Sequence, residues 1–245
     1  AFTHATVIQP ISEFLGAWAR RMGYEGNLEL VRNGANPESL KPTFDPSEVE
    51  ELKVKLGKKP GDVYLVNTAR LVNQKGFDTT IRALLLLPSH IKLLVVGGGP
   101  DEESLRALTK ELALEDRVIF TGQVERNVVT QYRMASDIFV GPSRSEGLGN
   151  AFLSAMACRM PVIATQVGGI ADFLFDAKRN PEKGTTGWAV DVDSPEQIAE
   201  KVKEILAHPE TVKEVTERAR KMVEAEYDWD IVAKKMMEVF QVVTQ

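Results

Sequence analysis

The sequence predicts an α/β protein built on a doubly wound parallel sheet. Short, continuously apolar segments such as "VYLVNTAR" and "IKLLVVGGGP" alternate with longer segments of helical periodicity. Apolar residues at nearly every position of a strand indicate burial on both faces, as in a parallel sheet covered by helices. Glycines gather where several of these strands end. The 245 residues, 43% hydrophobic and 27% charged, are ordinary for a globular protein and suffice for one large or two small domains.

The first part of the chain precedes this alternation. The segment "SEFLGAWARRMG" predicts a helix with Ser12 as its N-cap and Gly23 at its end. The next segment, "NLELVRNGAN", predicts a short strand followed by a turn at Asn33-Gly34. Residues 46–57 predict a polar helix between a proline and a glycine. The regular alternation begins after this helix.

The sheet region follows a regular order of strand and helix. The expected strands lie at 63–70, 91–100, 117–122, 137–143, 161–169 and 184–191, and the expected helices at 77–88, 101–114, 127–135, 149–160 and 194–207. We expect "LLLLP" to be the buried end of the helix at 77–88. Ser194 is expected to cap the helix at 194–207, with Pro195 at its first position. The tail from 209 to 245 is expected to be helical.

The charge and cysteine content exclude several classes of protein. Thirty basic against 35 acidic residues give a formal net charge of -5, which argues against a nucleic-acid-binding surface. A basic cluster at 53–59 fits a solvated helix face, with an anionic membrane contact as the alternative. Cys158 is the only cysteine, so an internal disulfide is impossible and zinc-type cysteine spacing is absent. No apolar run approaches the ~18 residues of a membrane span.

The carboxyl ends of the strands carry residues suited to a phosphorylated ligand. Ligands of open parallel sheets bind beyond these ends, and here they bear Arg70, Gly97–Gly99, Gly122, the segment "PSRSEGLG" and residues 165–169. Glycines let backbone N–H groups approach a ligand, and helix N-termini favour anions.

Two cations lie in the loop after the first sheet strand. Arg70 or Lys75 alone would be an ordinary surface cation, but together in one βα loop they favour binding of a diphosphate. The triplet "GGGP" is a weaker signal, since it matches neither a dinucleotide-binding fingerprint nor a P-loop. The pair Asp191 and Asp193 is explained by helix capping, and we expect no metal site.

The segment "SEGLGNAFLS" places a carboxylate beside glycines at the start of a helix. Glu146, Asn150 and Ser154 are four residues apart and are therefore expected on one side, facing the ligand rim. A carboxylate, an amide and a hydroxyl would converge there on a sugar or ribose. The alternative for Glu146 is an acid that only complements the helix dipole.

An ordered set of segments resembles a known family. The set comprises "VIQPISEFL", "LELVRNGANPESLKP", "NTARLVNQKGFD", "LLVVGGGP", "VIFTGQV", "ASDIFVGPSRSEGLGNAFLSAMACRMPVIATQVGGIAD", "TTGWAVD" and the Tyr227–Trp229 tail. Together they resemble the nucleotide-binding C-terminal half of retaining glycosyltransferases of the GT-B fold, the group 1 or family 4 class. The resemblance covers essentially the whole chain. It implies one Rossmann-like GT-B half with a C-terminal helical tail.

The resemblance implies that the chain consists of three parts. Residues 1–24 would be a remnant of the N-terminal GT-B domain, 25–225 the donor-binding domain, and 226–245 a crossover helix. The donor would be a nucleotide-sugar such as a UDP-, GDP- or ADP-sugar, with no metal or other cofactor.

Roles for single residues also follow from the resemblance. Arg70 and Lys75 would hold the diphosphate, and Glu146 would contact the donor sugar. The remaining contacts would be the loop of Gly122, Gln123 and Val124 against the base, and the backbone around Gly147, Leu148, Gly149 and Asn150.

The chain departs from the family pattern at three places. Ser154 stands where the family has a second Glu that binds the ribose, and a neutral hydroxyl is a weaker partner than a carboxylate. The family's G-G-x-P-E appears as "GGIAD", which leaves Asp172 as a shortened acid. The resemblance also leads us to expect that most of the N-terminal domain, which supplies acceptor contacts in the family, is not part of this sequence.

These observations favour the donor-binding half of a retaining hexosyltransferase of polysaccharide or glycolipid synthesis, with an unknown acceptor. It is expected to be weak or inactive without its N-terminal domain. The alternative is a non-catalytic nucleotide-sugar-binding subunit of a split enzyme. A sugar-phosphate isomerase or epimerase lacks support, because no histidine falls at the rim.

The last helix is expected to need a partner surface. Its apolar residues Ile231, Val232, Met236, Val239 and Phe240 would otherwise face water. We expect them to pack on residues 1–24 or to form a homodimer contact. A cytoplasmic location is expected, with peripheral contact at the inner face of a membrane left open.

Overall fold

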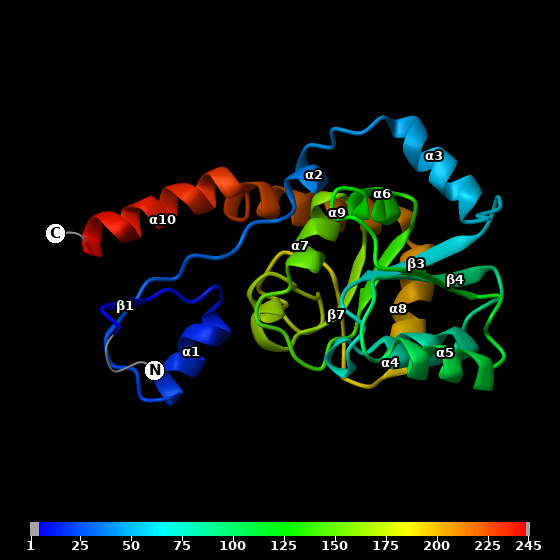
Figure 1. Ribbon diagram of the computed structural model, residues 1–245, viewed down its shortest axis with the longest axis horizontal. Helices are drawn as coiled ribbons and strands as arrows, with labels where there is room; N and C mark the ends of the chain where they lie inside the picture. The colour runs from blue at the N-terminus through cyan, green and yellow to red at the C-terminus, as the bar shows by residue number, and fades with distance from the viewer. Residues whose placement is uncertain (1–4, 244–245) are drawn as a thin grey trace.

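A parallel sheet of six strands lies at the centre of the computed structural model, which describes residues 5–243 (Figure 1). The strand order is β5-β4-β3-β6-β7-β8. The strands are β3 Val63–Thr68, β4 Ile91–Val96, β5 Val118–Gly122, β6 Ile138–Gly141, β7 Val162–Thr165 and β8 Trp188–Val190. The order reverses between β3 and β6, which pair in parallel with Leu65 opposite Ile138. The expected doubly wound α/β fold is confirmed, and its switch point lies between β3 and β6.

Helices cover both faces of this sheet (Figure 1). One face packs against α4 Phe77–Ala83, α5 Glu102–Glu111 and α8 Pro195–Ala207. The other packs against α7 Asn150–Ala157 and α9 Pro209–Glu226, with α2 Pro37–Leu40 at its margin. Two apolar cores result, which is why the strands are apolar at nearly every position. Along the chain, α3 Pro46–Lys55 follows α2 and precedes β3. It contacts α6 Val129–Met134.

The first residues form a separate small unit. Strands β1 Val7–Ile8 and β2 Asn27–Leu28 pair in parallel, and α1 Glu13–Arg21 connects them. Ser12 is the N-cap of α1, where its Oγ accepts a hydrogen bond from Leu15 N at 3.2 Å. The expected cap is therefore confirmed. Residues 1–4 and 244–245, which belong to the expected N-terminal remnant and crossover helix, lie outside the described residues.

The expected turn at Asn33-Gly34 is wrong. The chain is not turned there but runs on towards α2, and Ala35 N donates to Tyr227 O at 2.8 Å. A Cβ at Gly34 would lie 2.8 Å from the Trp229 ring, so the glycine serves a close approach rather than a turn. Tertiary packing has overridden a local turn signal.

One expectation about a helix end is wrong, and another is confirmed in position only. The end of the helix at 77–88 is a 3₁₀ turn, Leu84–Leu86, and only part of it is buried. Leu84 is fully buried, whereas Leu85 and Leu86 are 53% and 45% exposed. Ser194 occupies the N-cap position of α8, but its side chain makes no capping hydrogen bond.

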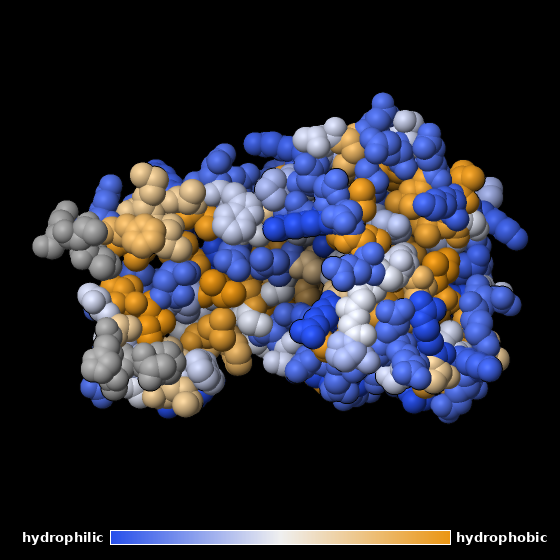
Figure 2. All heavy atoms as spheres, viewed as in Figure 1, coloured by the Kyte–Doolittle hydropathy of each residue, from blue (hydrophilic) through white to orange (hydrophobic). Residues whose placement is uncertain are grey.

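The last helix, α10 Trp229–Val243, continues from α9 towards the side of the molecule that carries β1 and α1 (Figure 1). Val232 is buried, Ile231, Met236 and Val239 are half-buried, and Phe240 is 61% exposed. Figure 2 shows apolar residues on this same lobe. A homodimer through this helix stays a prediction. None of the helices within residues 5–243 has the length and apolar character that crossing a membrane requires.

Candidate functional site

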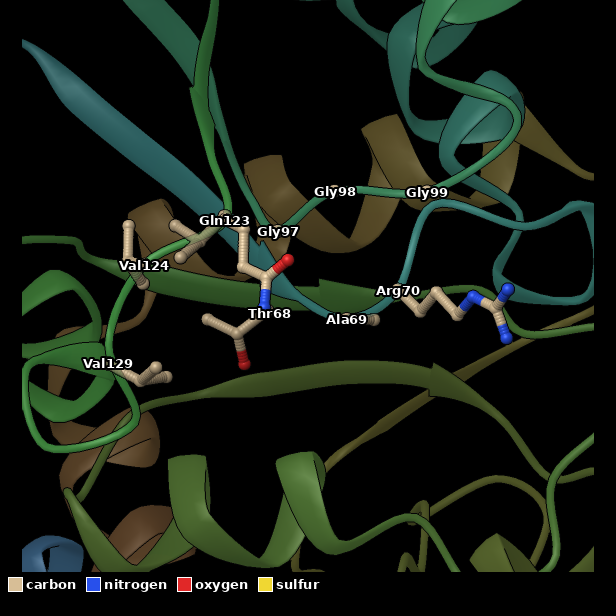
Figure 3. A pocket seen from close by; sticks show the side chains of 10 residues that line it. Thr68, Ala69, Arg70, Gly97, Gly98, Gly99, Gln123, Val124 and Val129 are labelled. Atoms are coloured by element: carbon tan, nitrogen blue, oxygen red, sulfur yellow. The ribbon is translucent and has the colours of Figure 1, made fainter.

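A cavity of about 540 Å³ opens at the carboxyl ends of β3, β4 and β5 (Figure 3). Its lining comprises Thr68, Ala69, Arg70, Val96, Gly97, Gly98, Gly99, Gln123, Val124 and Val129. In Figure 3 Val124 and Val129 lie at one end, the glycine loop runs along one side, and the Arg70 side chain extends away at the opposite end. The cavity therefore has an apolar end and a cationic end.

The glycine triplet is required for the shape of this cavity. Gly97 has a φ of 142°, and a Cβ there would lie 2.1 Å from the Ala69 carbonyl oxygen. A Cβ at Gly99 would lie 2.3 Å from the Leu71 carbonyl oxygen. The loop after β4 thus lies directly against the loop after β3, as only glycine permits. In the sequence the triplet was only a weak indication of a ligand site, yet in the structure it forms one wall of the cavity.

The expected base-binding loop lies at this cavity. Gln123 and Val124 line it, whereas Gly122 ends β5 and accepts a hydrogen bond from Gly97 N at 3.1 Å. Arg70 lines the cavity and is exposed. Lys75 does not line it.

Lys75 instead pairs with Glu146 across the switch point. Lys75 ends a short 3₁₀ turn, Asn73–Lys75, after β3, and Glu146 lies in the loop after the neighbouring strand β6. Lys75 Nζ donates to Glu146 Oε1, and Ser143 Oγ donates to the same atom at 3.2 Å. The side chains of Lys75 and Glu146 are 25% and 10% exposed, so the pair is largely shielded from water. Glu146 is therefore a partnered carboxylate of the site loops rather than a free rim acid.

Arg144 fixes the two loops that bear this pair. Its guanidinium donates to Asp78 at 3.0 and 2.7 Å, to Asp193 Oδ1 at 2.8 Å and to the Asn73 carbonyl oxygen at 2.6 Å. Burial alone would raise the pKa of Asp78, but the hydrogen bonds and charge of Arg144 bring it below its ordinary value. The loop after β6 is thereby held against the loop after β3.

This arrangement corrects the interpretation of Asp191 and Asp193 as capping residues. Asp193 binds Arg144, and Asp191 binds Arg179 at 2.9 Å and accepts from Gln197 Nε2 at 2.8 Å. Within residues 5–243 no group of three His, Cys, Asp or Glu side chains could hold a metal ion.

The expected convergence of three residues is wrong for Glu146, whereas Asn150 and Ser154 do line one cavity, the smaller one beside α6. Helix α7 begins at Asn150 after Gly149, whose φ is 98°, so Glu146 lies outside the helix and the four-residue spacing does not apply to it. Ser154 is buried, and its Oγ donates to the Asn150 carbonyl oxygen at 2.8 Å and accepts from Asn36 N at 3.0 Å. The hydroxyl joins α7 to the segment before α2.

The remaining site residues are held by loop packing against α1. A Cβ at Gly168 would lie 1.8 Å from the Glu146 carbonyl oxygen, so the loop after β7 presses on the Glu146 loop. Ser12 Oγ donates to the Gly147 carbonyl oxygen at 2.6 Å, while the Leu148 side chain is buried. Asp172 accepts from Glu13 N at 2.8 Å, so it binds the start of α1. Burial raises the pKa of Asp172, and hydrogen bonding by Glu13 N only partly opposes it.

Sequence reasoning missed several residues near the site. Thr68 and Val129 line the main cavity, and Arg133 lines a second one together with Arg126 and Trp229. Thr68 and Trp229 lie in segments that resemble the family, but no ligand role was expected for them, and Arg126, Val129 and Arg133 lie outside those segments. Arg133 in particular occupies a short helical segment whose pattern gives no sign of a ligand.

An open, doubly wound sheet with glycine- and cation-bearing loops at its switch point defines a nucleotide-binding class of α/β domain. The family follows from the sequence comparison: residues 48–222 match the profile of "Glycosyl transferases group 1". The chain belongs to this glycosyltransferase family, and the expected resemblance is confirmed.

Among curated proteins, the chain is 32% identical over 233 residues to a GDP-mannose-dependent alpha-(1-6)-phosphatidylinositol monomannoside mannosyltransferase of Mycobacterium tuberculosis. That match covers 90% of this chain but 57% of the relative, so the chain spans little more than half of that relative's length.

Solved structures show the same fold. The sucrose-phosphate synthase of Thermosynechococcus elongatus superposes with a TM-score of 0.84 at 26% identity, over 99% of this chain and 59% of that one. HepE of Anabaena, solved in complex with UDP and glucose, superposes with a TM-score of 0.82 at 20% identity, over 98% of this chain and 63% of that one. These neighbours establish a GT-B half with its C-terminal helix.

Proposed function

We propose that this chain is the nucleotide-sugar-binding half of a retaining glycosyltransferase that transfers a hexosyl group. The observation that carries the proposal is the Lys75–Glu146 pair at the switch point, one loop away from a cavity whose cationic end is Arg70. A nucleotide-sugar needs an apolar surface for its base, cations for its diphosphate and a carboxylate for its sugar hydroxyls. This chain places the three along one edge of the sheet.

The base would lie against Gln123 and Val124, with Val129 closing the apolar end. Arg70 and Lys75 would hold the diphosphate, and backbone groups of Gly147 to Asn150 would approach the donor. Binding of the donor would draw Lys75 towards the diphosphate and release the Glu146 carboxylate to accept hydrogen bonds from the sugar. The ion pair would therefore hold Lys75 and Glu146 in place before binding, and the bound donor would separate them.

In the transfer step, the bond between the sugar C1 and the leaving diphosphate oxygen breaks, and a bond from C1 to an acceptor hydroxyl oxygen forms on the same face. The acceptor proton passes to the departing diphosphate. Arg70 and Lys75 stabilise the negative charge that develops on that group. No metal or cofactor is required, and donor binding should survive EDTA.

We keep the three parts of the chain as a proposal: 1–24 as the end of an N-terminal domain, 25–225 as the donor-binding domain and 226–245 as the crossover helix. The docking of α1 through Ser12 and Asp172 onto the Glu146 and Gly168 loops supports it. The acceptor surface would then lie beyond α1, and the chain by itself would bind donor but transfer weakly.

GDP-mannose is the first donor to test, because a 32% identical relative is GDP-mannose-dependent. Calorimetric titration with GDP, UDP, ADP and their hexose conjugates should identify one nucleotide that binds. Lys75→Ala should weaken that nucleotide about 10- to 100-fold, since it removes a charge-assisted contact. Lys55→Ala, on the exposed side of α3, is the matched control and should bind normally.

Glu146→Gln separates the sugar contact from the phosphate contact. The variant should keep its affinity for the free nucleoside diphosphate and lose the added affinity that the attached sugar provides. Failure of all three nucleotides and their conjugates to bind the unmodified chain would sink the proposed function.

A further inference from the structure

Arg133 is a buried cation that has no counter-ion among residues 5–243. It lies on α6 and is 5% exposed. Its Nη2 donates to Thr68 Oγ1 at 2.8 Å, but within the described part of the chain Nε and Nη1 find no hydrogen-bond partner. No acidic side chain of residues 5–243 forms an ion pair with it. Three N–H bonds of a buried guanidinium are therefore still able to donate.

This guanidinium remains charged at neutral pH. Burial lowers the pKa of Arg133 to about 10, which is still well above 7. A buried charge without a partner is among the most unfavourable groups in a folded protein. An anion that enters from solvent would remove that unfavourable state.

The side chain opens onto a cavity of about 230 Å³, beside the main one. Arg126 contributes a second cation, and no carboxylate of the described residues lines the cavity. The Ser154 hydroxyl lies in its wall but is already bonded to Asn150 and Asn36, so it does not compensate the charge of Arg133. The cavity is thus small and cationic, and one of the residues that line it, Arg133, carries the buried, partnerless Nε and Nη1.

The two cavities adjoin at α6. Val129 lines both of them, and Thr68 of the main cavity is the hydroxyl that holds Arg133. Only the Thr68 side chain would therefore separate a ligand in contact with Thr68 from the Arg133 guanidinium.

We propose that the cavity lined by Arg133 and Arg126 is a phosphate subsite. The planar guanidinium fork matches phosphate oxygens in geometry and charge. The phosphate is either free in solution or part of the molecule bound in the main cavity. That the subsite belongs to a donor site rests on the proposed function, whereas anion binding at Arg133 does not.

Thermal unfolding in a phosphate-free buffer, with added sodium phosphate, tests the subsite. Sodium chloride of equal ionic strength is the reference. The unmodified chain should gain about 2–4 °C in Tm at saturating phosphate. Arg133→Met should unfold at the same or a higher temperature without phosphate, because it removes an uncompensated charge, and should lose the phosphate-dependent gain.

Two further variants make the result specific. Arg117→Met is the control at a half-buried arginine, because its Nε and Nη2 already donate to the carbonyl oxygens of Leu87, Pro88 and Ile91; it should keep the phosphate response. Arg70→Ala, which alters the main cavity, should keep it too. If Arg133→Met does not fold, the exposed Arg126→Gln should reduce the response.

Adding the nucleotide that binds best identifies the source of the phosphate. Additive gains in Tm mean that free phosphate and nucleotide occupy separate cavities. Loss of the phosphate response in the presence of nucleotide means that the nucleotide brings its own phosphate to Arg133, which would replace the placement of its diphosphate at Arg70 and Lys75.

The subsite is overturned if phosphate gives no gain beyond sodium chloride, or if the gain survives in Arg133→Met. Nucleotide binding in the same assay is judged separately. If phosphate raises the Tm through Arg133 but no nucleotide binds, the subsite stands and the proposed function is refuted. If a nucleotide binds but phosphate does not raise the Tm through Arg133, the proposed function stands and the subsite is refuted.

Discussion

Arg144 and Asp78 form a bidentate ion pair, with Nη1–Oδ1 and Nη2–Oδ2 distances of 3.0 and 2.7 Å. Arg144 follows β6, and Asp78 lies in the first turn of α4, beyond β3. The pair therefore closes the two site loops against each other at the point where the strand order reverses. Lys75 and Glu146 lie on these two loops and meet as a consequence.

Arg144→Met should loosen the site without touching a ligand. We expect a loss of about 1–3 kcal/mol in the free energy of unfolding, because charge-assisted hydrogen bonds at a partly buried position are lost. Nucleotide-sugar binding should weaken as well, because Lys75 and Glu146 would no longer be held together. Urea unfolding and calorimetric titration measure the two effects.

The matched control for Arg144→Met is Arg159→Met. Arg159 also pairs with a carboxylate, that of Glu217 at 2.8 Å, but both side chains are more than 40% exposed. Its loss should change stability by less than about 1 kcal/mol and leave binding intact. Equal effects of the two variants would contradict a positioning role for Arg144.

Stability at acid pH should depend on Asp78. Arg144 holds the pKa of Asp78 below its ordinary 3.8, so the folded state binds its proton less readily than the unfolded state. The resulting stabilisation is complete above pH 3.8 and is lost as the pH falls through the lower, folded pKa. Asp78→Asn should therefore flatten the acid limb of a plot of unfolding free energy against pH.

Asp172 should change the unfolding free energy with pH in the opposite direction to Asp78. Burial raises its pKa, so the folded state binds its proton more readily than the unfolded state. Its contribution to stability grows as the pH falls through the raised pKa towards 3.8. Asp172→Asn should thus steepen the loss of stability on acidification. The same change of slope in both variants would contradict the assignment.

Gly97→Ala should damage the fold of the loop after β4. The new Cβ would lie 2.1 Å from the Ala69 carbonyl oxygen, at a φ of 142° that L-residues avoid. We expect a loss of at least about 2 kcal/mol from backbone strain and the clash. Urea unfolding measures this loss.

Gly98→Ala is the neighbouring control for Gly97→Ala. The nearest atom to its Cβ would be 3.7 Å away, an ordinary contact. Stability should stay within about 0.5 kcal/mol of the unmodified chain. Because Gly98 lines the main cavity, this variant can still be stable and bind nucleotide less well.

Much of the fold was predictable because its signals are local. Apolar strands buried on both faces and helix starts such as Ser12 follow from residues close together in sequence. The strand ends also located the main cavity, with Arg70, Gln123 and Val124 at its wall. The Asn33-Gly34 turn failed because the Tyr227 carbonyl oxygen and the Trp229 ring, far away in sequence, hold that segment in place.

The site was predicted only in part. Spacing along one helix suggested that Glu146, Asn150 and Ser154 converge, but a left-handed glycine separates Glu146 from α7. The partner of Glu146 proved to be Lys75, which lies 71 residues away along the chain. No pattern in the sequence could reveal that pairing.

By itself the sequence determined the doubly wound α/β fold, the glycosyltransferase family and the edge of the sheet where a ligand would bind. Each depends on composition and order along the chain. Only the tertiary structure decided that Lys75 meets Glu146, that Ser154 has a structural partner in Asn36, and that Arg133 is buried with no counter-ion in the described part of the chain. The physical reason is that the charge state and hydrogen bonding of a side chain depend on which distant groups surround it, and only folding brings those groups together.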